Sequence, residues 1–206
     1  MRSLLLRGPL ATLAIKRNEN KFEKLLGIQT GGMGESANNE NYHYQGADFK
    51  IIFEALKCLP QVCKNKRLTD FGCGKGRAVF AAEYSGFDLI TGVEIDKNLV
   101  HCAENNLATY SFKRKESKIE FIVSDASEYK ILSDSAVFYF FNPFGESVME
   151  KVKENIIKFA NESKQEVFIL YINPKFRSIW EKSGFIIYKT ITTGFYTEAI
   201  IYQYKP

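Results

Sequence analysis

The chain has 206 residues, of which 45% are hydrophobic and 25% are charged, a composition typical of one globular domain with a sizeable buried core. It excludes a disordered chain, a collagen-like repeat and a small disulfide-stabilised protein. The formal net charge is +4. Positions 1–17 hold the whole excess, because the rest of the chain has equal numbers of acidic and basic residues. A strongly basic nucleic-acid-binding surface on the body of the protein is therefore not implied.

The N-terminal segment is basic and partly apolar, which raises the question of a signal or transit peptide. Its basic residues are Arg2, Arg7, Lys16 and Arg17. Arg7 interrupts the apolar run, no clear small-residue cleavage site follows, and Gly8 with Pro9 would break the amphipathic helix of a transit peptide. We expect a packed or loose arm in preference to a targeting or membrane-surface segment. No apolar run approaches the roughly 20 residues of a membrane-spanning helix.

Cysteine and histidine usage bears on metals and on the compartment. The four cysteines, Cys58, Cys63, Cys73 and Cys102, form no C-x-x-C pair, and the chain has only two histidines. A structural zinc site needs four suitably spaced ligands, so no metal site is predicted. The composition favours reduced cysteines in a cytoplasmic protein over disulfides.

Ahead of the regular part of the chain lies an unusually long loop. Residues 27–46 are rich in Gly and Asn and lack periodicity, and loops of this length are usually functional or disordered. The next segment, Ala47 to Leu59, has apolar residues at helical spacing and is followed by Pro60.

From Arg67 onward, short apolar runs alternate with helical stretches. The predicted strands are Leu68–Phe71, Leu89–Val93, Ile119–Val123, Ala136–Phe141 and Val167–Ile172. The predicted helices between them are Arg77–Tyr84, Lys97–Thr109, a short one near Ala126–Tyr129, and Val148–Phe159. This alternation predicts an α/β fold, a doubly wound and mostly parallel sheet with helices on both faces.

The last part of the chain departs from the alternation. A helix is expected from Pro174 to about Lys182, followed by strands over Phe185–Ile191 and Glu198–Tyr204 with only a turn between them. This pattern predicts an antiparallel hairpin that completes a seven-stranded sheet. We divide the chain into an N-terminal extension, residues 1–66, and a sheet domain, residues 67–206.

The strongest motif is L-T-D-F-G-C-G-K-G-R, residues 68–77, where the first strand meets a helix. Gly72, Gly74 and Gly76 allow a sharp turn and a close approach to a ligand. A dinucleotide fingerprint, G-x-G-x-x-G, is not present because position 77 is Arg, and a phosphate-binding P-loop is also missing. Asp70 precedes the glycines, and its carboxylate disfavours a pyrophosphate and suits a cationic ligand.

Three further polar elements follow the next three strands. Glu94 ends the second strand in G-V-E-I-D, where a carboxylate can accept both hydroxyls of a ribose. Asp125 lies in S-D-A after the third strand, suitably placed for an adenine amine, and Asn142 lies in F-F-N-P-F-G after the fourth. All lie at the carboxyl ends of strands, where open α/β sheets bind their ligands.

D-F-G-C-G-K-G, G-V-E-I-D, S-D-A and F-N-P-F, in this order and spacing, resemble the class I S-adenosylmethionine-dependent methyltransferases, and the resemblance covers residues 67–204. The upstream G-I-Q-T-G-G with Tyr44, together with G-C-G-K-G-R and Y-I-N-P, is similar to a group of small, largely uncharacterised bacterial members. The resemblance implies the fold, the cofactor S-adenosylmethionine and methyl transfer. It implies no particular acceptor.

The resemblance also implies roles for individual residues. Asp70 and the loop Gly72 to Gly76 would hold the methionine part of the cofactor. Glu94 would bind the ribose hydroxyls, and Ile95 would lie beside the adenine. The remaining assignments are Asp125 to the adenine amine, Ala126 to a backbone contact, and Tyr44 to closure over the methionine end or the acceptor.

Catalysis of methyl transfer depends largely on alignment and on deprotonation of the acceptor. Asn142-Pro143 is similar to the N-P-P-[YF] motif of methyltransferases that act on planar nitrogens, but Phe144 replaces its second proline. Asn142 and Pro143 are thus candidate catalytic residues for a nitrogen acceptor. The alternative is that they only end a strand.

Three functions remain open on the sequence alone. The first is a methyltransferase acting on a nitrogen of a protein or a small molecule, with nucleic acid a less favoured acceptor because the body is neutral. The second is a catalytically silent cofactor-binding or interaction module with the same fold. The third is a dinucleotide-dependent oxidoreductase, which Arg77 disfavours.

Overall fold

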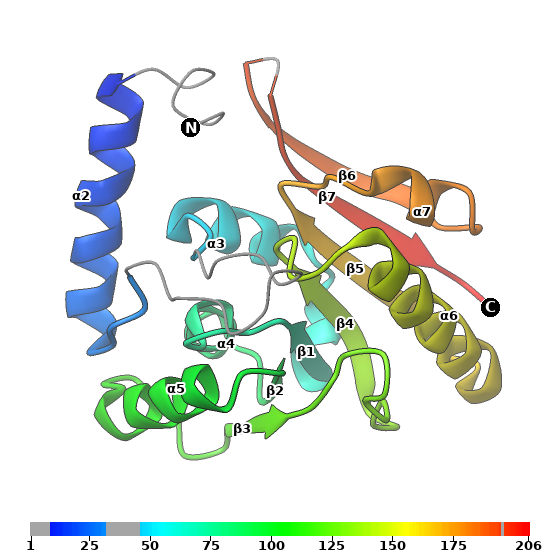
Figure 1. Cartoon of the computed structure of the whole chain (residues 1–206), viewed down its shortest axis with the longest axis horizontal. Helices are drawn as coiled ribbons and strands as arrows, with labels where there is room; N and C mark the ends of the chain where they lie inside the picture. The colour runs from blue at the N-terminus through cyan, green and yellow to red at the C-terminus, as the bar shows by residue number, and fades with distance from the viewer. Residues whose placement is uncertain (1–8, 32–45, 195) are drawn as a thin grey trace.

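The computed structural model describes residues 9–31, 46–194 and 196–206, and within this part of the chain a single sheet forms the centre of the molecule (Figure 1). Its seven strands follow the order β3-β2-β1-β4-β5-β7-β6. The strands are β1 (Arg67–Phe71), β2 (Leu89–Glu94), β3 (Lys118–Val123), β4 (Ser135–Phe140), β5 (Val167–Ile172), β6 (Ile186–Thr193) and β7 (Tyr196–Tyr204). Strands β1 to β5 are parallel, and β7 lies antiparallel between β5 and β6. The predicted α/β fold with a terminal antiparallel hairpin is confirmed.

Helices cover both faces of the sheet. They are α2 (Pro9–Leu26), α3 (Phe49–Cys58), α4 (Arg77–Tyr84), α5 (Lys97–Thr109), α6 (Glu146–Ser163) and α7 (Arg177–Glu181), with a short 3₁₀ helix at Gln61–Asn65. One apolar core lies between the sheet and α3 and α4, and a second lies between the sheet and α6 and α7. Strands β1, β4 and β5 are buried along their whole length, and the sequences of β4 and β5 are accordingly almost entirely apolar.

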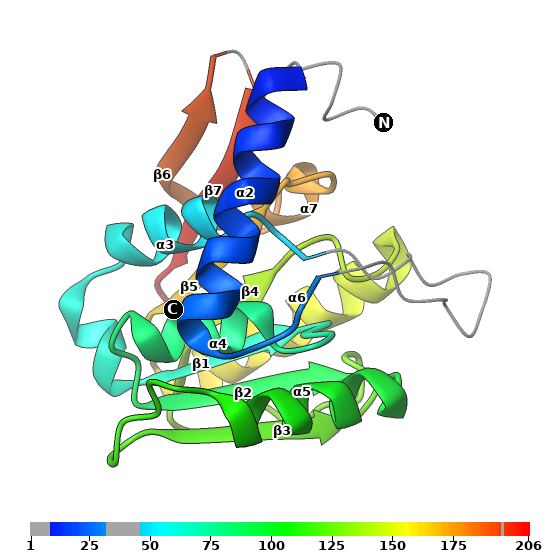
Figure 2. The ribbon, with the colours of Figure 1, turned by 90° about the vertical axis from the view of Figure 1, so that its left-hand side faces the viewer.

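The N-terminal segment contains a regular helix that the sequence analysis did not predict. Pro9 is the first residue of α2, a position at which proline is favoured because no helical partner is lost there. Proline therefore begins this helix and does not break it. The helix crosses the outer side of α3, away from the sheet (Figure 2).

One further expectation was wrong. Instead of a short helix near Ala126–Tyr129, the chain forms a turn over residues 126–128. The Oδ1 atom of Asp125 accepts hydrogen bonds from both the backbone N and the Oγ of Ser127, each at 2.8 Å. This short-range capping stabilises a turn that competes with a helix.

Among the described residues, no helix is both long enough and apolar enough to cross a membrane.

The end of α2 depends on Gly27. Its φ of +71° lies in the left-handed region, and a Cβ atom at this position would lie 2.5 Å from the Oγ of Ser111. The adjacent carbonyl of Leu26 accepts a hydrogen bond from the backbone N of Ser111 at 2.9 Å. The glycine thus allows the chain to turn while it stays in contact with the segment after α5.

We predict that Gly27→Ala lowers the free energy of unfolding by about 2–4 kcal/mol, because it adds both backbone strain and a clash. Gly86→Ala is the matched control: its φ is +97° but nothing lies within 4 Å of an added Cβ, so a loss of about 1–2 kcal/mol is expected. Urea denaturation measures both values. Equal losses in the two variants would contradict the role of the Ser111 contact.

Candidate functional site

The glycine-rich loop between β1 and α4 runs close to both neighbouring strands. The backbone N atoms of Gly72 and Cys73 donate to the carbonyl of Val93, at 2.8 and 3.1 Å. The φ angles of Gly72, Gly74 and Gly76 are all positive, as the sharp turn requires. A Cβ atom on Gly72 would lie 2.1 Å from the Cβ of Pro143. The loop is therefore in direct contact with the segment that follows β4.

Asp70 places a buried carboxylate at the carboxyl end of β1. The residue is 2% exposed, and no described residue forms a hydrogen bond or ion pair with its carboxylate. Burial, and secondarily the nearby charge of Glu94, hold the pKa of Asp70 well above its ordinary value. An unpaired buried charge is costly, so a cationic ligand beside this carboxylate would be strongly favoured.

Glu94 lies at the end of β2, at the edge of the same loop. Its Oε2 accepts a hydrogen bond from the backbone N of Gly74 at 3.0 Å, and its Oε1 accepts from the backbone N atoms of Ile95 and Asp96, at 2.8 and 3.0 Å. These bonds fix the carboxylate next to the glycine-rich loop. Its oxygens have further lone pairs for ligand hydroxyls.

An apolar surface lies beyond Glu94. The side chains of Ile95 and Val123 are 53% and 54% exposed, and Glu94 and Val123 are register partners across β2 and β3. Two large exposed aliphatic groups suit a flat aromatic ring. Val123 was not a candidate from the sequence, although an apolar residue at the carboxyl end of an edge strand is a usable signal; it pairs with Glu94, which precedes Ile95 in the chain. Asp125 and Ala126 follow this strand after Ser124.

Asn142 is the second residue after β4; it adopts a left-handed conformation, with φ of 45°, and is 8% exposed. Its Nδ2 donates to the carbonyl of Asn173, and its Oδ1 accepts from the hydroxyl of Tyr171 at 2.9 Å and from the backbone N of Lys175 at 3.4 Å. These contacts fix the orientation of the carboxamide. The sequence analysis missed the contribution of Tyr171, a buried β5 residue.

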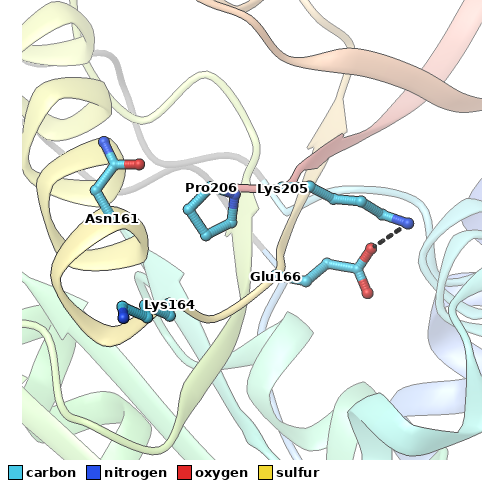
Figure 3. Close-up of a pocket in the computed structure, with 5 residues that line it drawn as sticks. All are labelled: Asn161, Lys164, Glu166, Lys205 and Pro206. Carbon is cyan, nitrogen blue, oxygen red and sulfur yellow. Dashed lines mark ion pairs between the residues drawn. The ribbon is translucent and has the colours of Figure 1, made fainter.

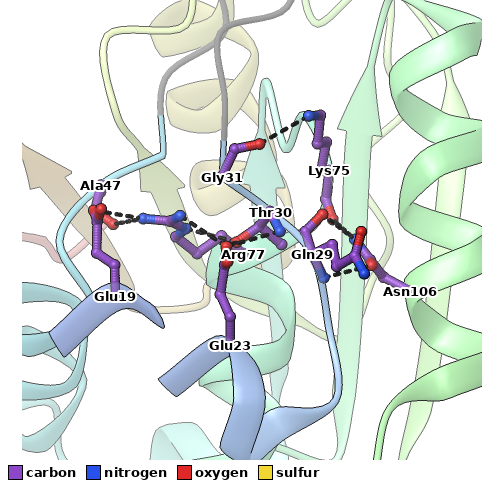
Figure 4. Close-up of polar contacts among 9 residues, drawn as sticks. All are labelled: Glu19, Glu23, Gln29, Thr30, Gly31, Ala47, Lys75, Arg77 and Asn106. Carbon is purple, nitrogen blue, oxygen red and sulfur yellow. Dashed lines mark hydrogen bonds and ion pairs between the residues drawn. The ribbon is translucent and has the colours of Figure 1, made fainter. Parts of the chain in front are cut away.

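The N-terminal extension contacts the glycine-rich loop and the start of α4 through a polar network (Figure 4). Its centre is Arg77, which is 4% exposed and which the sequence analysis used only to reject a dinucleotide fingerprint. The residues it joins are Glu19, Glu23, Thr30 and Ala47. Tyr44, the remaining candidate, lies outside the described residues.

A separate surface depression lies at the other end of the sheet (Figure 3). It is lined by Asn161, Lys164, Glu166, Lys205 and Pro206, with an ion pair of 3.1 Å between Lys205 and Glu166. Glu166 precedes β5, whereas the glycine-rich loop follows β1, so the two sites are at opposite strand ends. No group of three or more His, Cys, Asp or Glu residues that could hold a metal occurs in the described part of the chain.

Comparison with known proteins agrees with this geometry. Residues 69–164, which span the glycine-rich loop, Glu94, Asp125 and Asn142, match the family model described as "Methyltransferase domain". The chain contains a class I S-adenosylmethionine-dependent methyltransferase domain. It is accordingly an enzyme of the S-adenosylmethionine-dependent methyltransferase class. No curated protein shows a significant match to the whole sequence.

Solved structures share the fold of this methyltransferase. A protein from Pyrococcus horikoshii OT3 has a TM-score of 0.55 at 17% identity, over 78% of this chain and 93% of that one. An RNA methyltransferase from Salinibacter ruber, solved with S-adenosylhomocysteine, has 0.50 at 20% identity, over 76% and 90%. A ribosomal protein L11 methylase from Lactobacillus delbrueckii subsp. bulgaricus has 0.50 at 16% identity, over 75% and 76%. At these identities the likeness concerns the fold alone.

The residues present fit S-adenosylmethionine. The buried carboxylate of Asp70, which has no partner among the described residues, suits the cationic amino-acid end. Glu94 suits the ribose hydroxyls, and the exposed Ile95 and Val123 suit the adenine ring. Glycines at the turn after β1 leave room for a ligand to approach the backbone. When bound, the cofactor supplies an electrophilic methyl group.

We predict that Asp70→Asn stabilises the cofactor-free protein at neutral pH. Because the pKa of Asp70 is raised by burial, the folded state binds this proton more tightly than the unfolded state does. The stability of the wild-type protein therefore falls as the pH rises from the ordinary range of an aspartate through the folded pKa. An amide avoids this loss, so urea denaturation should show the variant to be more stable above that window. It should also bind S-adenosylhomocysteine more weakly, and unchanged binding would contradict the assignment.

We also predict that Glu94→Ala weakens binding of S-adenosylhomocysteine by about 1–3 kcal/mol, because it removes the carboxylate that we expect to accept the ribose hydroxyls. Isothermal titration calorimetry measures the change. Glu104→Ala, on the exposed surface of α5, is the control and should leave the affinity unchanged. A Glu94 variant with the affinity of the control would rule out the ribose contact.

Proposed function

We propose that this methyltransferase transfers a methyl group to a nitrogen atom of a protein or small-molecule acceptor, with Asn142 and Pro143 at the point of transfer. The single observation that supports the proposal is the contact between Pro143 and the glycine-rich loop. An added Cβ on Gly72 would lie only 2.1 Å from the Cβ of Pro143. The segment after β4 is thus adjacent to the loop that is expected to hold the methionine part of the cofactor.

The orientation of the Asn142 carboxamide is consistent with a nitrogen acceptor. Its Nδ2 donates to the carbonyl of Asn173, so an incoming N–H would bond to its Oδ1. The lone pair that would accept this N–H is the one that now accepts from the backbone N of Lys175 at 3.4 Å. That bond is long, and an acceptor N–H at normal distance would replace it. The stronger bond from Tyr171, at 2.9 Å, would remain and hold the amide in place.

Acceptor selection is assigned to the residues outside the central sheet. The domain from residue 67 to 206 consists almost entirely of the seven strands and their connecting helices. Residues 1–66 are therefore the principal extension of the chain beyond this domain. We propose that this extension provides the acceptor side of the site, with Tyr44 in it, and that the protein acts in the cytoplasm. All four cysteines are unpaired in the structure, as a reducing compartment would require.

The deciding experiment is incubation of the purified enzyme with radiolabelled S-adenosylmethionine and a fractionated cell lysate. The proposal predicts label in protein or in small molecules, at a position stable to base as an N-methyl group is. Label in nucleic acid would overturn the acceptor assignment. Binding of S-adenosylhomocysteine without transfer to any fraction would instead favour the catalytically silent module.

We predict that Asn142→Gly lowers the rate of transfer to the labelled fraction by about 100-fold or more, with little change in affinity for S-adenosylhomocysteine. Glycine tolerates the left-handed φ of 45° at this position, so the variant tests the carboxamide and not the backbone. Single-turnover rates with the labelled fraction measure the effect. Equal rates for variant and wild type would show that Asn142 only ends the strand.

A further inference from the structure

Arg77 is the most highly connected buried side chain next to the cofactor loop. Its Nε donates to the Oγ1 of Thr30 at 2.8 Å, and one terminal nitrogen donates to both Glu19 and the carbonyl of Ala47 at 2.9 Å. The other terminal nitrogen donates to Glu23 at 3.1 Å. One guanidinium thus joins α2, the segment after it and the residue before the N-cap of α3 to the first turn of α4 (Figure 4).

Within residues 29–31, Gly31 is bound to the glycine-rich loop directly, and Gln29 is bound to it through Asn106. The Nζ of Lys75 donates to the carbonyl of Gly31 at 3.0 Å. The carboxamide of Asn106 on α5 accepts from the backbone N of Gln29 at 2.8 Å and donates to the carbonyls of Gln29 and Lys75, at 3.2 and 3.0 Å. The segment is therefore tied to the loop at its two ends, directly at Gly31 and through Asn106 at Gln29.

Thr30 connects the two sets of contacts. The Oε1 of Glu23 accepts from its backbone N at 2.8 Å and from its hydroxyl at 2.7 Å, and the same oxygen accepts from Arg77. Thr30 is fully buried. The position of residues 29–31 is thus set by a charge-assisted cluster whose only described cation is Arg77.

We propose that Arg77 is a positioning residue that holds residues 29–31 against the glycine-rich loop, so that this segment forms one wall of the site for the amino-acid end of the cofactor. The inference goes beyond the proposed acceptor and rests only on cofactor binding. The amino-acid end is the relevant one because Arg77 lies in the first turn of α4, whose backbone N–H groups suit a carboxylate. This turn directly follows the loop that connects it to β1, the strand of the buried Asp70.

The chemistry of the cluster explains why arginine is required. Removal of the guanidinium would leave the carboxylates of Glu19 and Glu23, both on α2, without their cation, and would remove the ion pairs that hold α2 to α4. Residues 29–31 would move with α2. Lysine cannot replace arginine, because one ammonium group cannot match four planar, divergent hydrogen bonds.

The experiment compares two ligands. S-adenosylhomocysteine carries the amino-acid end, whereas 5′-methylthioadenosine has the same adenosine and sulfur without it. The variant Arg77→Met should weaken binding of S-adenosylhomocysteine about tenfold or more, with a change of less than about twofold for 5′-methylthioadenosine. Isothermal titration measures both affinities, and the ratio of the two is the diagnostic quantity.

Arg67→Met is the matched control. Arg67 is a second buried arginine, 7% exposed, bound to Asp134 and Thr91 at the amino end of β1. Its loss should lower stability and leave the ratio of the two affinities unchanged. A ratio unchanged in Arg77→Met as well, or altered equally in both variants, would overturn the proposal.

Thr30→Val keeps the test valid if Arg77→Met fails to fold. Valine is similar in shape to threonine, but it lacks the hydroxyl that joins Glu23 to Arg77. The expected result is the same selective loss for S-adenosylhomocysteine, at several-fold. A Thr30→Val protein with wild-type affinity for both ligands would contradict the role of the segment.

Discussion

Close backbone approach at the carboxyl end of β1 is the constraint on which the rest of the site depends. The loop after β1 lies so near its neighbours that an added Cβ on Gly72 would overlap Pro143, and one on Gly76 would lie 2.9 Å from Phe121 and Phe80. Gly92 on β2 shows the same restriction, because its added Cβ would lie 2.7 Å from the Sγ of Cys73. The absence of side chains at these three glycines therefore allows the ends of three strands to present Asp70, Glu94 and Asn142 at one edge of the sheet.

The electrostatics of this edge favour ligand binding at the expense of stability. Burial, and secondarily the nearby charge of Glu94, raise the pKa of Asp70 well above its ordinary value. Glu94 is stabilised by three backbone N–H groups, whereas Asp70 has no such partner among the described residues. A cationic ligand would relieve this imbalance. A site of this kind is destabilising until it is occupied, a common cost of function.

The central sheet could be predicted closely from the sequence because its signals are local. Strands buried on both faces are continuous apolar runs, and Asp96 caps the helix from Lys97 as expected, with its side chain accepting from Asn98. The glycine-rich loop and Glu94 follow from spacing alone. Asp125 shows the limit of such signals: the same carboxylate that could begin a helix forms a turn with Ser127 instead.

Long-range polar contacts could not be predicted. Arg77 binds partners that lie between 30 and 58 positions away in the sequence, and Asn142 binds Tyr171 and Asn173, 29 and 31 positions away. No periodicity or spacing rule pairs an arginine with carboxylates on a helix that was itself not predicted. Arg77 at the position of the third fingerprint glycine excludes a dinucleotide-binding motif on sequence grounds. The contacts that Arg77 makes could be found only from the fold.

The Arg77 cluster also changes the meaning of the charge balance in the N-terminal extension. Residues 18–66 have as many acidic as basic residues, which suggests a neutral surface. However, Glu19 and Glu23 point toward Arg77, with side chains only 26% and 18% exposed, whereas Lys21 and Lys24 on the same helix are exposed. The acidic charge of this part of α2 is directed inward and neutralised, and the basic charge faces solvent. Because surface potential depends on where charges lie and not on their sum, the outer side of α2 is more basic than composition indicates.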